Sequence, residues 1–218
     1  MILIVYCHPS KTSHSFRILE HVKKTLSRQK QAFEVIDLYE EKFNASFSET
    51  EYQRIREKIR ETDDDVKALQ EKISKANTLI FIYPVWWYTM PARLKGFIDR
   101  FFSSGFAYKF FKVHPVLLFG ANLLSYIPGI RYLMQPYVAT PLLKVKKTII
   151  FRTYGGPSSG KRIFGNTVSV LENVVLRFCG ITKITVHELF NIDKEVFTKS
   201  DEENYLQKVE RICQKFES

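Results

Sequence analysis

Two segments of the sequence carry residue types that suit a phosphorylated, planar ligand. Residues 8–15 hold four hydroxyl side chains and Lys11, directly before an amphipathic stretch that is expected to form a helix. The start of a helix offers free backbone N–H groups and the positive end of its dipole, which favours a phosphate. Ser13 could instead serve only as the cap of that helix, and this alternative stays open. Residues 84–91 contain Trp86 and Trp87 side by side, the only tryptophans of the chain.

Two adjacent tryptophans cannot both face one core, so at least one is expected to border a planar ligand. An aromatic core or interface patch is the alternative. A third segment, 153–160, contains Gly155-Gly156, where backbone can approach a flat ligand closely and offer N–H donors. A Gly-Gly pair alone is also typical of an ordinary turn.

The sequence lacks several motifs that would indicate other chemistry. It has neither G-x-G-x-x-G nor G-x-x-x-x-G-K-[ST], which argues against Rossmann dinucleotide or Walker nucleotide binding. Cys7, Cys179 and Cys213 are odd in number and show no C-x-x-C spacing, so neither a disulfide framework nor a metal site is expected. The start of the chain does not resemble a signal peptide. A cytoplasmic location is therefore expected.

The three segments each follow an apolar run that is expected to be a strand. Strands are expected at 2–7, 33–38, 78–83, 148–153 and 182–189. Helices are expected at 13–28, 49–75 with an acidic interruption at 63–65, 91–102, 168–178 and 201–216. Because strands alternate with helices and several are apolar throughout, an α/β fold is expected, with a doubly wound five-stranded parallel sheet and helices on both faces. We expect a single domain over 1–218, with ligand-binding loops at the carboxyl ends of the strands.

The chain is basic, with a formal net charge of +10. Residues 93–183 hold 14 Lys and Arg but only two acidic residues, Asp99 and Glu172. A basic face can attract phosphates or anionic lipid, or can simply be solvated. Nucleic-acid binding is not expected, because the aromatic residues lie in apolar runs and do not alternate with basic residues.

The chain resembles the NAD(P)H:quinone oxidoreductase family, the DT-diaphorase-like branch of the flavodoxin-like proteins. The resemblance runs along most of the chain and is most specific at 83–87 (YPVWW) and 90–100 (MPARLKGFIDR), followed by 105–108 (GFAY). Further matches are the His-Pro and serine-rich turn at 8–16 and the sequence Thr153-Tyr154-Gly155-Gly156.

The resemblance implies a bound flavin, FMN or FAD, and NAD(P)H as co-substrate. The flavin phosphate is then expected at His8, Ser13, His14, Ser15 and Phe16. The ring is expected on two loops, formed by Pro84, Val85, Trp86, Trp87, Tyr88 and by Thr153, Tyr154, Gly155, Gly156. A quinone-like acceptor would follow NAD(P)H at the same place, by a ping-pong scheme, in a homodimer with each flavin at the subunit boundary. The chemistry belongs to the flavin, so no catalytic side chain is assigned.

This chain departs from the family in two ways. Some members carry a Tyr and a His after the Gly-Gly loop, and neither is present here. Lys161 or Arg162 could offset charge on a reduced flavin or bind an NAD(P)H phosphate, unless both are merely solvated. The second departure is an apolar insertion at about 109–144, interrupted by Pro115, Gly120 and Pro128. Residues 110–143 are expected to form a lid or dimer element, with a peripheral membrane contact as the less favoured alternative, and not a membrane span.

Other functions remain open at this level. Azo or nitro compounds are alternative acceptors, and an ancillary regulatory subunit of a membrane potassium-efflux system is an alternative role. A one-electron flavodoxin-type carrier is less favoured, because such carriers are typically acidic. The choices between FMN and FAD, between NADH and NADPH and among acceptors are not decided by the sequence.

Overall fold

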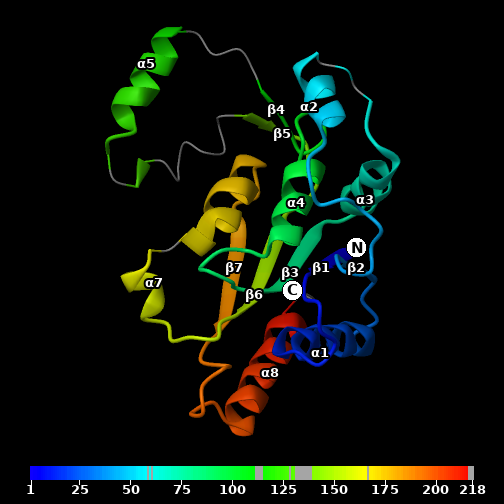
Figure 1. The fold of residues 1–218 in the computed structure, drawn as a ribbon, viewed down its shortest axis with the longest axis vertical. Coiled ribbons are helices and arrows are strands. Elements are labelled where there is room, and N and C mark those ends of the chain that lie inside the picture. The colour runs from blue at the N-terminus through cyan, green and yellow to red at the C-terminus, as the bar shows by residue number, and fades with distance from the viewer. Residues whose placement is uncertain are drawn as a thin grey trace.

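The structure is a computed structural model that describes residues 1–57, 59, 61–110, 115–127, 129–130, 139–165 and 167–215; of residues 115–118 and 122 it describes the backbone. Its centre is a five-stranded parallel sheet in the order β2-β1-β3-β6-β7. The strands are β1 (Ile2–Tyr6), β2 (Phe33–Asp37), β3 (Thr78–Pro84), β6 (Lys147–Thr153) and β7 (Lys183–Leu189). Figure 1 shows this sheet with helices on both faces. The predicted fold class is confirmed.

Two separate apolar cores pack against the two faces of the sheet. On one face, α1 (His14–Arg28) and α8 (Lys199–Gln214) bury Ile18, Leu26 and Val209 against strand residues such as Ile4. On the other face lie α3 (Asp64–Ser74), α4 (Ala92–Phe101) and the π-helix η3 (Leu171–Leu176). The three cysteines are divided between these cores, with Cys7 and Cys179 on the α4 face and Cys213 on the α8 face.

The central strands are apolar because both of their faces are covered. All five residues of β1 are buried, and so are six of the seven residues of β3 and of β6. Alternate side chains point into the two cores, so the usual polar positions of a half-exposed strand are absent. The strands that the continuous apolar runs predicted are confirmed to within one residue at each end.

The charged stretch predicted as a helix with an interruption forms two helices. The first, α2 (Glu49–Arg56), begins at a Ser48–Glu51 capping box and buries none of its side chains. The second, α3, begins after Asp63 and buries Val66, Leu69 and Ile73 against the sheet. An interruption is therefore present, but it lies earlier than predicted, at 57–63, and Asp64 and Asp65 begin α3 because acidic side chains favour the first turn of a helix.

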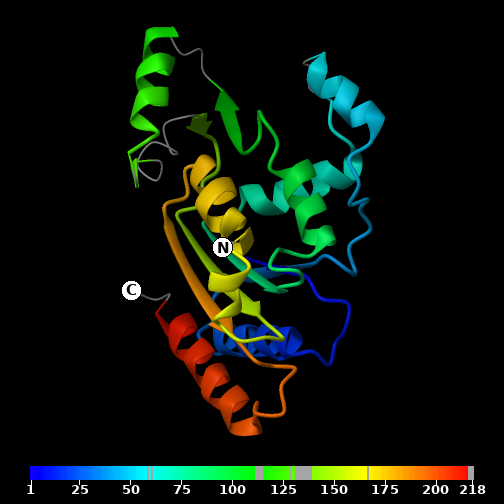
Figure 2. The same ribbon diagram turned by 60° about the vertical axis from the view of Figure 1, so that its left-hand side comes forward.

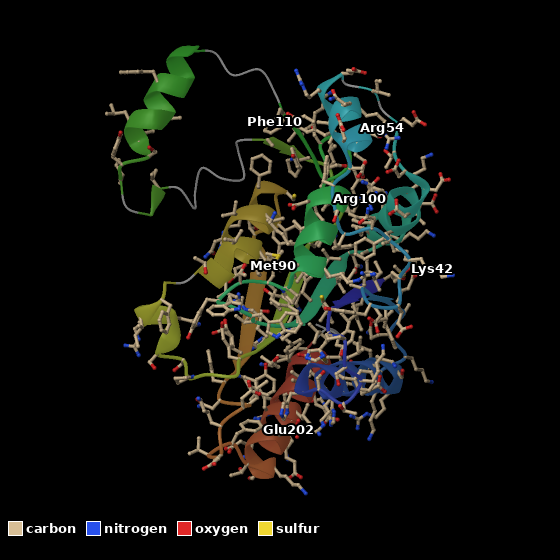
Figure 3. All side chains as sticks on the ribbon, in the orientation of Figure 1. Lys42, Arg54, Met90, Arg100, Phe110 and Glu202 are labelled. Atoms are coloured by element: carbon tan, nitrogen blue, oxygen red, sulfur yellow. The ribbon has the colours of Figure 1, made fainter. Side chains whose placement is uncertain are left out.

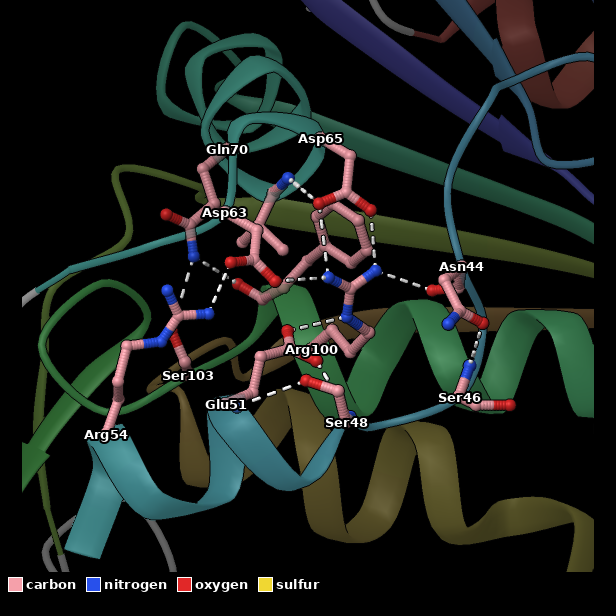
Figure 4. A network of polar contacts seen from close by, with 12 residues as sticks. Asn44, Ser46, Ser48, Glu51, Arg54, Asp63, Asp65, Gln70, Arg100 and Ser103 are labelled. Carbon is pink, nitrogen blue, oxygen red and sulfur yellow. Dashed lines mark hydrogen bonds and ion pairs between the residues drawn. The ribbon is translucent and has the colours of Figure 1, made fainter.

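Arg100 of α4 joins these two helices to the body of the protein. Its guanidinium bonds to Glu51 of α2 (2.7 Å) and to Asp65 at the start of α3 (2.6 Å), and it also donates to the Asn44 carbonyl (2.6 Å). The Arg100 side chain is 3% exposed. Figure 4 shows it at the centre of this network, with Asp63 contributing a third carboxylate at 3.3 Å.

The apolar insertion forms elements that the sequence did not predict. A two-stranded antiparallel ribbon, β4 (Tyr108–Phe110) and β5 (Ala139–Pro141), stands outside the main sheet. In the sequence, α5 (Pro115–Leu124) lies between these two strands, and Figures 1 and 2 show that it stands apart from the main sheet. No helix among the described residues has the length and apolar character needed to cross a membrane.

Two smaller elements complete the chain. A short helix, α7 (Gly160–Ile163), follows the Gly-Gly loop, and a 3-10 turn, η2 (Thr167–Ser169), precedes η3. The helix predicted at 168–178 is thus irregular, with six residues in π-helical form. The helix predicted at 201–216 starts two residues earlier, and Phe216 lies outside the described residues.

Candidate functional site

The carboxyl ends of β1, β3 and β6 meet around one cavity of about 550 Å³, within the range of about 300–1,000 Å³ that is usual for small-molecule sites. Its lining residues come from four strand-end loops and are His8, Ser13, His14, Ser15, Pro84, Val85, Trp86, Trp87, Tyr88, Thr153, Tyr154, Gly155, Gly156, Pro157, Ile192 and Asp193. Every predicted cofactor residue except Phe16 is among them. Phe16 lies beside the cavity, with its ring edge-on to Tyr6 at a centroid distance of 6.2 Å.

One end of the cavity is the start of α1. The Ser13 hydroxyl accepts a hydrogen bond from the Phe16 N–H (3.1 Å), so Ser13 caps the helix. The N–H groups of His14 and Ser15 have no carbonyl within the helix to bond. Helix capping by Ser13 and anion binding at the start of α1 are therefore compatible, because the cap occupies the Phe16 N–H and leaves the other two N–H groups for an anion. The Ser15 hydroxyl lies 3.0 Å from that of Thr153 and ties the helix start to β6.

Two histidines flank this end of the cavity in different settings. His8 Nδ1 accepts a hydrogen bond from the Ser10 N–H (2.9 Å), so neutral His8 carries its proton on Nε2. Burial lowers the pKa of His8, which favours this neutral form. His14 Nδ1 lies 2.6 Å from a Glu202 oxygen, and Arg17 bonds to the other oxygen of Glu202. Figure 3 shows Glu202 on α8 beside α1. The carboxylate therefore fixes the first turn of α1 to α8.

The other end of the cavity is an aromatic turn. Trp86 and Thr89 exchange backbone hydrogen bonds of 3.2 and 3.0 Å across a two-residue turn, in which Trp87 has φ 51° and Tyr88 has φ 55°. Left-handed backbone costs about 1–2 kcal/mol for a residue with a side chain, and such strain concentrates at functional sites. Trp86 is 42% exposed and Trp87 is 96% exposed. A core role for the tryptophan pair is therefore excluded.

The Gly-Gly loop forms the floor between these ends. A Cβ on Gly155 would lie 2.1 Å from an Asp193 carboxylate oxygen, whereas a Cβ on Gly156 would meet no atom within 4 Å. A side chain at position 155 would therefore displace the Asp193 carboxylate, whereas the Gly156 backbone is open to a ligand. The Tyr154 ring stacks on Phe190 with its centroid 4.5 Å away.

Three lining residues were missed from the sequence, namely Pro157, Ile192 and Asp193. The last two follow β7, whose carboxyl end lies at the same edge of the sheet. Applying the strand-end rule to this fifth strand would have indicated them.

Lys161 does not line the cavity. Its Nζ lies 2.5 Å from a Glu188 oxygen, so its charge is already paired. The neighbouring Arg162 is exposed and forms no ion pair with any described residue. Of the two basic residues after the Gly-Gly loop, Arg162 is the one that is solvated.

Thiolate catalysis by the nearest cysteine is excluded. Burial raises the pKa of Cys7 to about 12, so the thiol stays protonated at neutral pH. The cavity combines anion-binding N–H groups with an aromatic edge and an open backbone floor. Such an arrangement has the shape and the hydrogen-bond donors that suit a phosphorylated ring system.

Comparisons with known proteins agree with this geometry. The family model described as flavodoxin-like fold matches residues 1–216. An uncharacterized NAD(P)H oxidoreductase of Escherichia coli, YcaK, is 29% identical over 58% of this chain and 67% of its own length. The matched segments span only about half of several other curated relatives, for example 52% of an uncharacterized NAD(P)H oxidoreductase of Haemophilus influenzae.

Several solved structures match along nearly the whole chain. Smu.1420 from Streptococcus mutans is 30% identical, with a TM-score of 0.75 and 99% of both chains covered. The NAD(P)H:quinone oxidoreductase from Methanothermobacter marburgensis is 25% identical, with a TM-score of 0.78 and 100% of this chain and 96% of its own covered. Together with the sheet order and the cavity, these matches show that the chain belongs to the NAD(P)H:quinone oxidoreductase family of flavodoxin-like proteins.

Proposed function

We propose that the cavity binds a flavin, FMN or FAD, and that the chain uses it to pass a hydride from NAD(P)H to a quinone. The observation that carries this proposal is the single cavity that joins the free N–H groups of α1 to an aromatic edge across an open glycine floor. A flavin phosphate suits the first feature and its planar ring suits the other two. Both FMN and FAD place a phosphate and the same ring at these points.

The residues of the cavity would bind and orient the ligand. The His14 and Ser15 N–H groups would hold the phosphate, and the Gly156 backbone would lie against the ring. The Trp86–Tyr88 turn would cover one edge and restrict water. When bound, the flavin supplies the hydride chemistry, accepting from NAD(P)H and then giving to the acceptor at one place.

The names of relatives and of proteins with the same fold support this reading. NAD(P)H dehydrogenase [quinone] 1 of Rattus norvegicus is 25% identical over 87% of this chain. An FMN-dependent NADH-azoreductase of Bacillus anthracis, solved in complex with FMN, shares the fold at 14% identity. Azo compounds are therefore included among the acceptors to be tested.

The decisive measurement is a visible spectrum of the purified chain with FMN or FAD, before and after anaerobic NADPH or NADH. We expect the flavin absorbance near the visible maximum to bleach with the nucleotide and to return when a quinone is added. A chain that binds neither flavin would contradict the proposal. Denaturing the loaded protein and identifying the released flavin would decide between FMN and FAD.

A regulatory role is the second candidate. An Enterobacter relative named as a glutathione-regulated potassium-efflux system ancillary protein is 36% identical over 50% of this chain. The exposed apolar side chains of the insertion offer a surface for such a partner. Co-purification with a membrane transporter would support this role, and flavin reduction without any such partner would favour the enzyme alone.

We also propose that the chain works as a homodimer in which the insertion contacts a second copy. Phe119 and Leu123 on α5, and Tyr126 just after it, are 73%, 66% and 85% exposed. An apolar surface of this kind is usually covered by a partner. For residues 110–143 we prefer a lid or dimer role to a membrane contact, because a second copy of the chain would bury these apolar side chains in both subunits.

Leu123→Glu should convert a dimer of 25.6 kDa chains into monomers, because it places a charge in the proposed interface. Sedimentation velocity would measure the change. Val196→Glu is the matched control, since Val196 is also apolar and is 73% exposed, but lies near α8. A Leu123→Glu protein that stays dimeric would place the interface elsewhere. If that protein stays dimeric but no longer binds lipid vesicles that the wild type binds, the result would favour the membrane contact.

A further inference from the structure

The carboxylate of Glu188, on β7, joins Tyr154, which lines the cavity, to Lys161, which does not. The Tyr154 hydroxyl donates to its Oε1 (2.6 Å), and the Lys161 ammonium donates to its Oε2 (2.5 Å). Burial alone would raise the pKa of Glu188, but the bonds from Lys161 and Tyr154 and the charge of Arg152 outweigh it and leave that pKa lowered. Glu188 is therefore ionised at neutral pH.

Lys161 belongs to a helical turn that has few other anchors. α7 is four residues long, and Ser159 before it provides no side-chain cap. Ile163 and the following Phe164 are 71% and 67% exposed, so apolar burial holds the turn weakly. Among the described residues, the Lys161–Glu188 pair is the one ion pair between α7 and the sheet.

The same turn supports the strained aromatic loop. Gly160 packs so closely on Tyr88 that a Cβ there would lie 1.8 Å from the tyrosine hydroxyl oxygen. The ring of Phe164, which ends α7, lies 5.3 Å from that of Tyr88. A second support comes from η2, where the Thr167 hydroxyl donates to the Tyr88 carbonyl (2.7 Å). Because Trp87 and Tyr88 both have left-handed backbone, they need support of this kind to keep that conformation.

We infer that Glu188 and Lys161 are positioning residues for the aromatic edge of the cavity, acting through α7 on Tyr88 and not by contact with the ligand. This inference rests on the proposed function, since the ligand that senses the edge is the flavin ring. The ion pair fixes α7 to β7, α7 fixes Tyr88, and the Trp86–Tyr88 turn is held in its binding form before the ligand arrives. Preorganisation of this kind reduces the ordering cost of binding.

The test compares Lys161→Met, Glu188→Gln and the double variant with the wild type, by titrating each apo protein with FMN and with riboflavin and following flavin fluorescence. Each single variant should raise the dissociation constant of both ligands about 10-fold, a typical size for the loss of one supporting contact. The dissociation constant of the double variant should be no more than about twofold above that of the more affected single variant, because both substitutions remove the same contact. Arg162→Met, which removes a neighbouring charge that pairs with no described residue, should change either constant less than about twofold.

Equal losses for FMN and riboflavin are the distinguishing result, because riboflavin has the ring but no phosphate. A loss confined to FMN would show that Lys161 acts through its charge, and would overturn the inference. So would independent effects of the two single variants, or an Arg162→Met loss as large as that of Lys161→Met. If Lys161→Met does not fold, Glu188→Gln alone carries the test of loss, and Lys161→Arg should keep wild-type affinity within about threefold, since the guanidinium can still donate to Glu188.

The outcome for the inference is separable from that for the proposed function. A wild-type chain that binds neither FMN nor riboflavin would end the flavin proposal itself. A wild-type chain that binds both, with variants that bind equally well, would end only the positioning role of the pair.

Discussion

Replacing Arg100 with methionine should lower the free energy of unfolding by about 3 kcal/mol, near the lower end of the range for removing one partner of a buried ion pair. The arginine side chain is 3% exposed and holds Glu51 and Asp65. Methionine fills similar space but leaves these carboxylates without their cation. The lower end is expected because Asp63, the third acidic partner, is 36% exposed and can turn to water. Urea denaturation followed by far-UV circular dichroism would measure the change.

Lys95→Met is the matched control on the same helix. Lys95 pairs with Asp99 (2.6 Å), but both side chains are about half exposed, so its loss should change stability by less than about 0.5 kcal/mol. Equal effects of the two substitutions would contradict the importance of the buried network.

The Arg100 network also predicts a pH dependence. Burial would raise the pKa of Asp65, and the hydrogen bond and charge of Arg100 overcome this and lower it. A lowered folded pKa gives stability that is present above the ordinary Asp pKa of about 3.9 and is lost as pH falls through the folded value. The wild type should therefore lose stability in acid more steeply than Arg100→Met does.

Replacing Ser13 with aspartate should weaken FMN binding about 100-fold, because a carboxylate would stand beside the proposed phosphate position in a partly buried site. Aspartate is as good an N-cap as serine, so it can still accept from the Phe16 N–H and α1 should be preserved. Fluorescence titration of the apo protein with FMN would measure the loss.

Riboflavin is the internal control for this variant. It carries no phosphate, so its affinity should change less than about threefold if the ring end of the cavity is intact. Equal loss of both ligands would show that the substitution damages the cavity as a whole, and unchanged FMN binding would place the phosphate away from α1.

The sheet and its order of elements could be predicted because burial on both faces leaves a plain signal. Runs such as 78–83 contain no charged side chain, and their only polar groups are the hydroxyls of the first and last residues; parallel strands covered on both faces favour such apolar runs. The site followed from the same reasoning, since strand ends that are far apart in sequence meet at one edge. Thus His8, Trp86 and Gly156 line one cavity, as predicted.

What could not be predicted depends on pairings between distant segments. Lys161 was expected to face the ligand or solvent, but its partner Glu188 lies 27 positions away on β7. The ribbon formed by β4 and β5 pairs Tyr108 with Pro141, and three-residue strands leave no periodic signal. The backbone of Trp87 was also unforeseeable, because side chains of this size rarely adopt a positive φ.

The division of the three buried cysteines between the two cores gives the protein two chemical reporters of its own opening. Burial raises the pKa of Cys7, of Cys179 and of Cys213 to about 12, so none is a reactive thiolate while its layer stays closed. A thiol reagent therefore modifies Cys213 only when the α8 layer lifts, and Cys7 or Cys179 only when the α4 layer does. A time course of modification, followed by mass spectrometry, would therefore show which face of the sheet opens more readily by local unfolding.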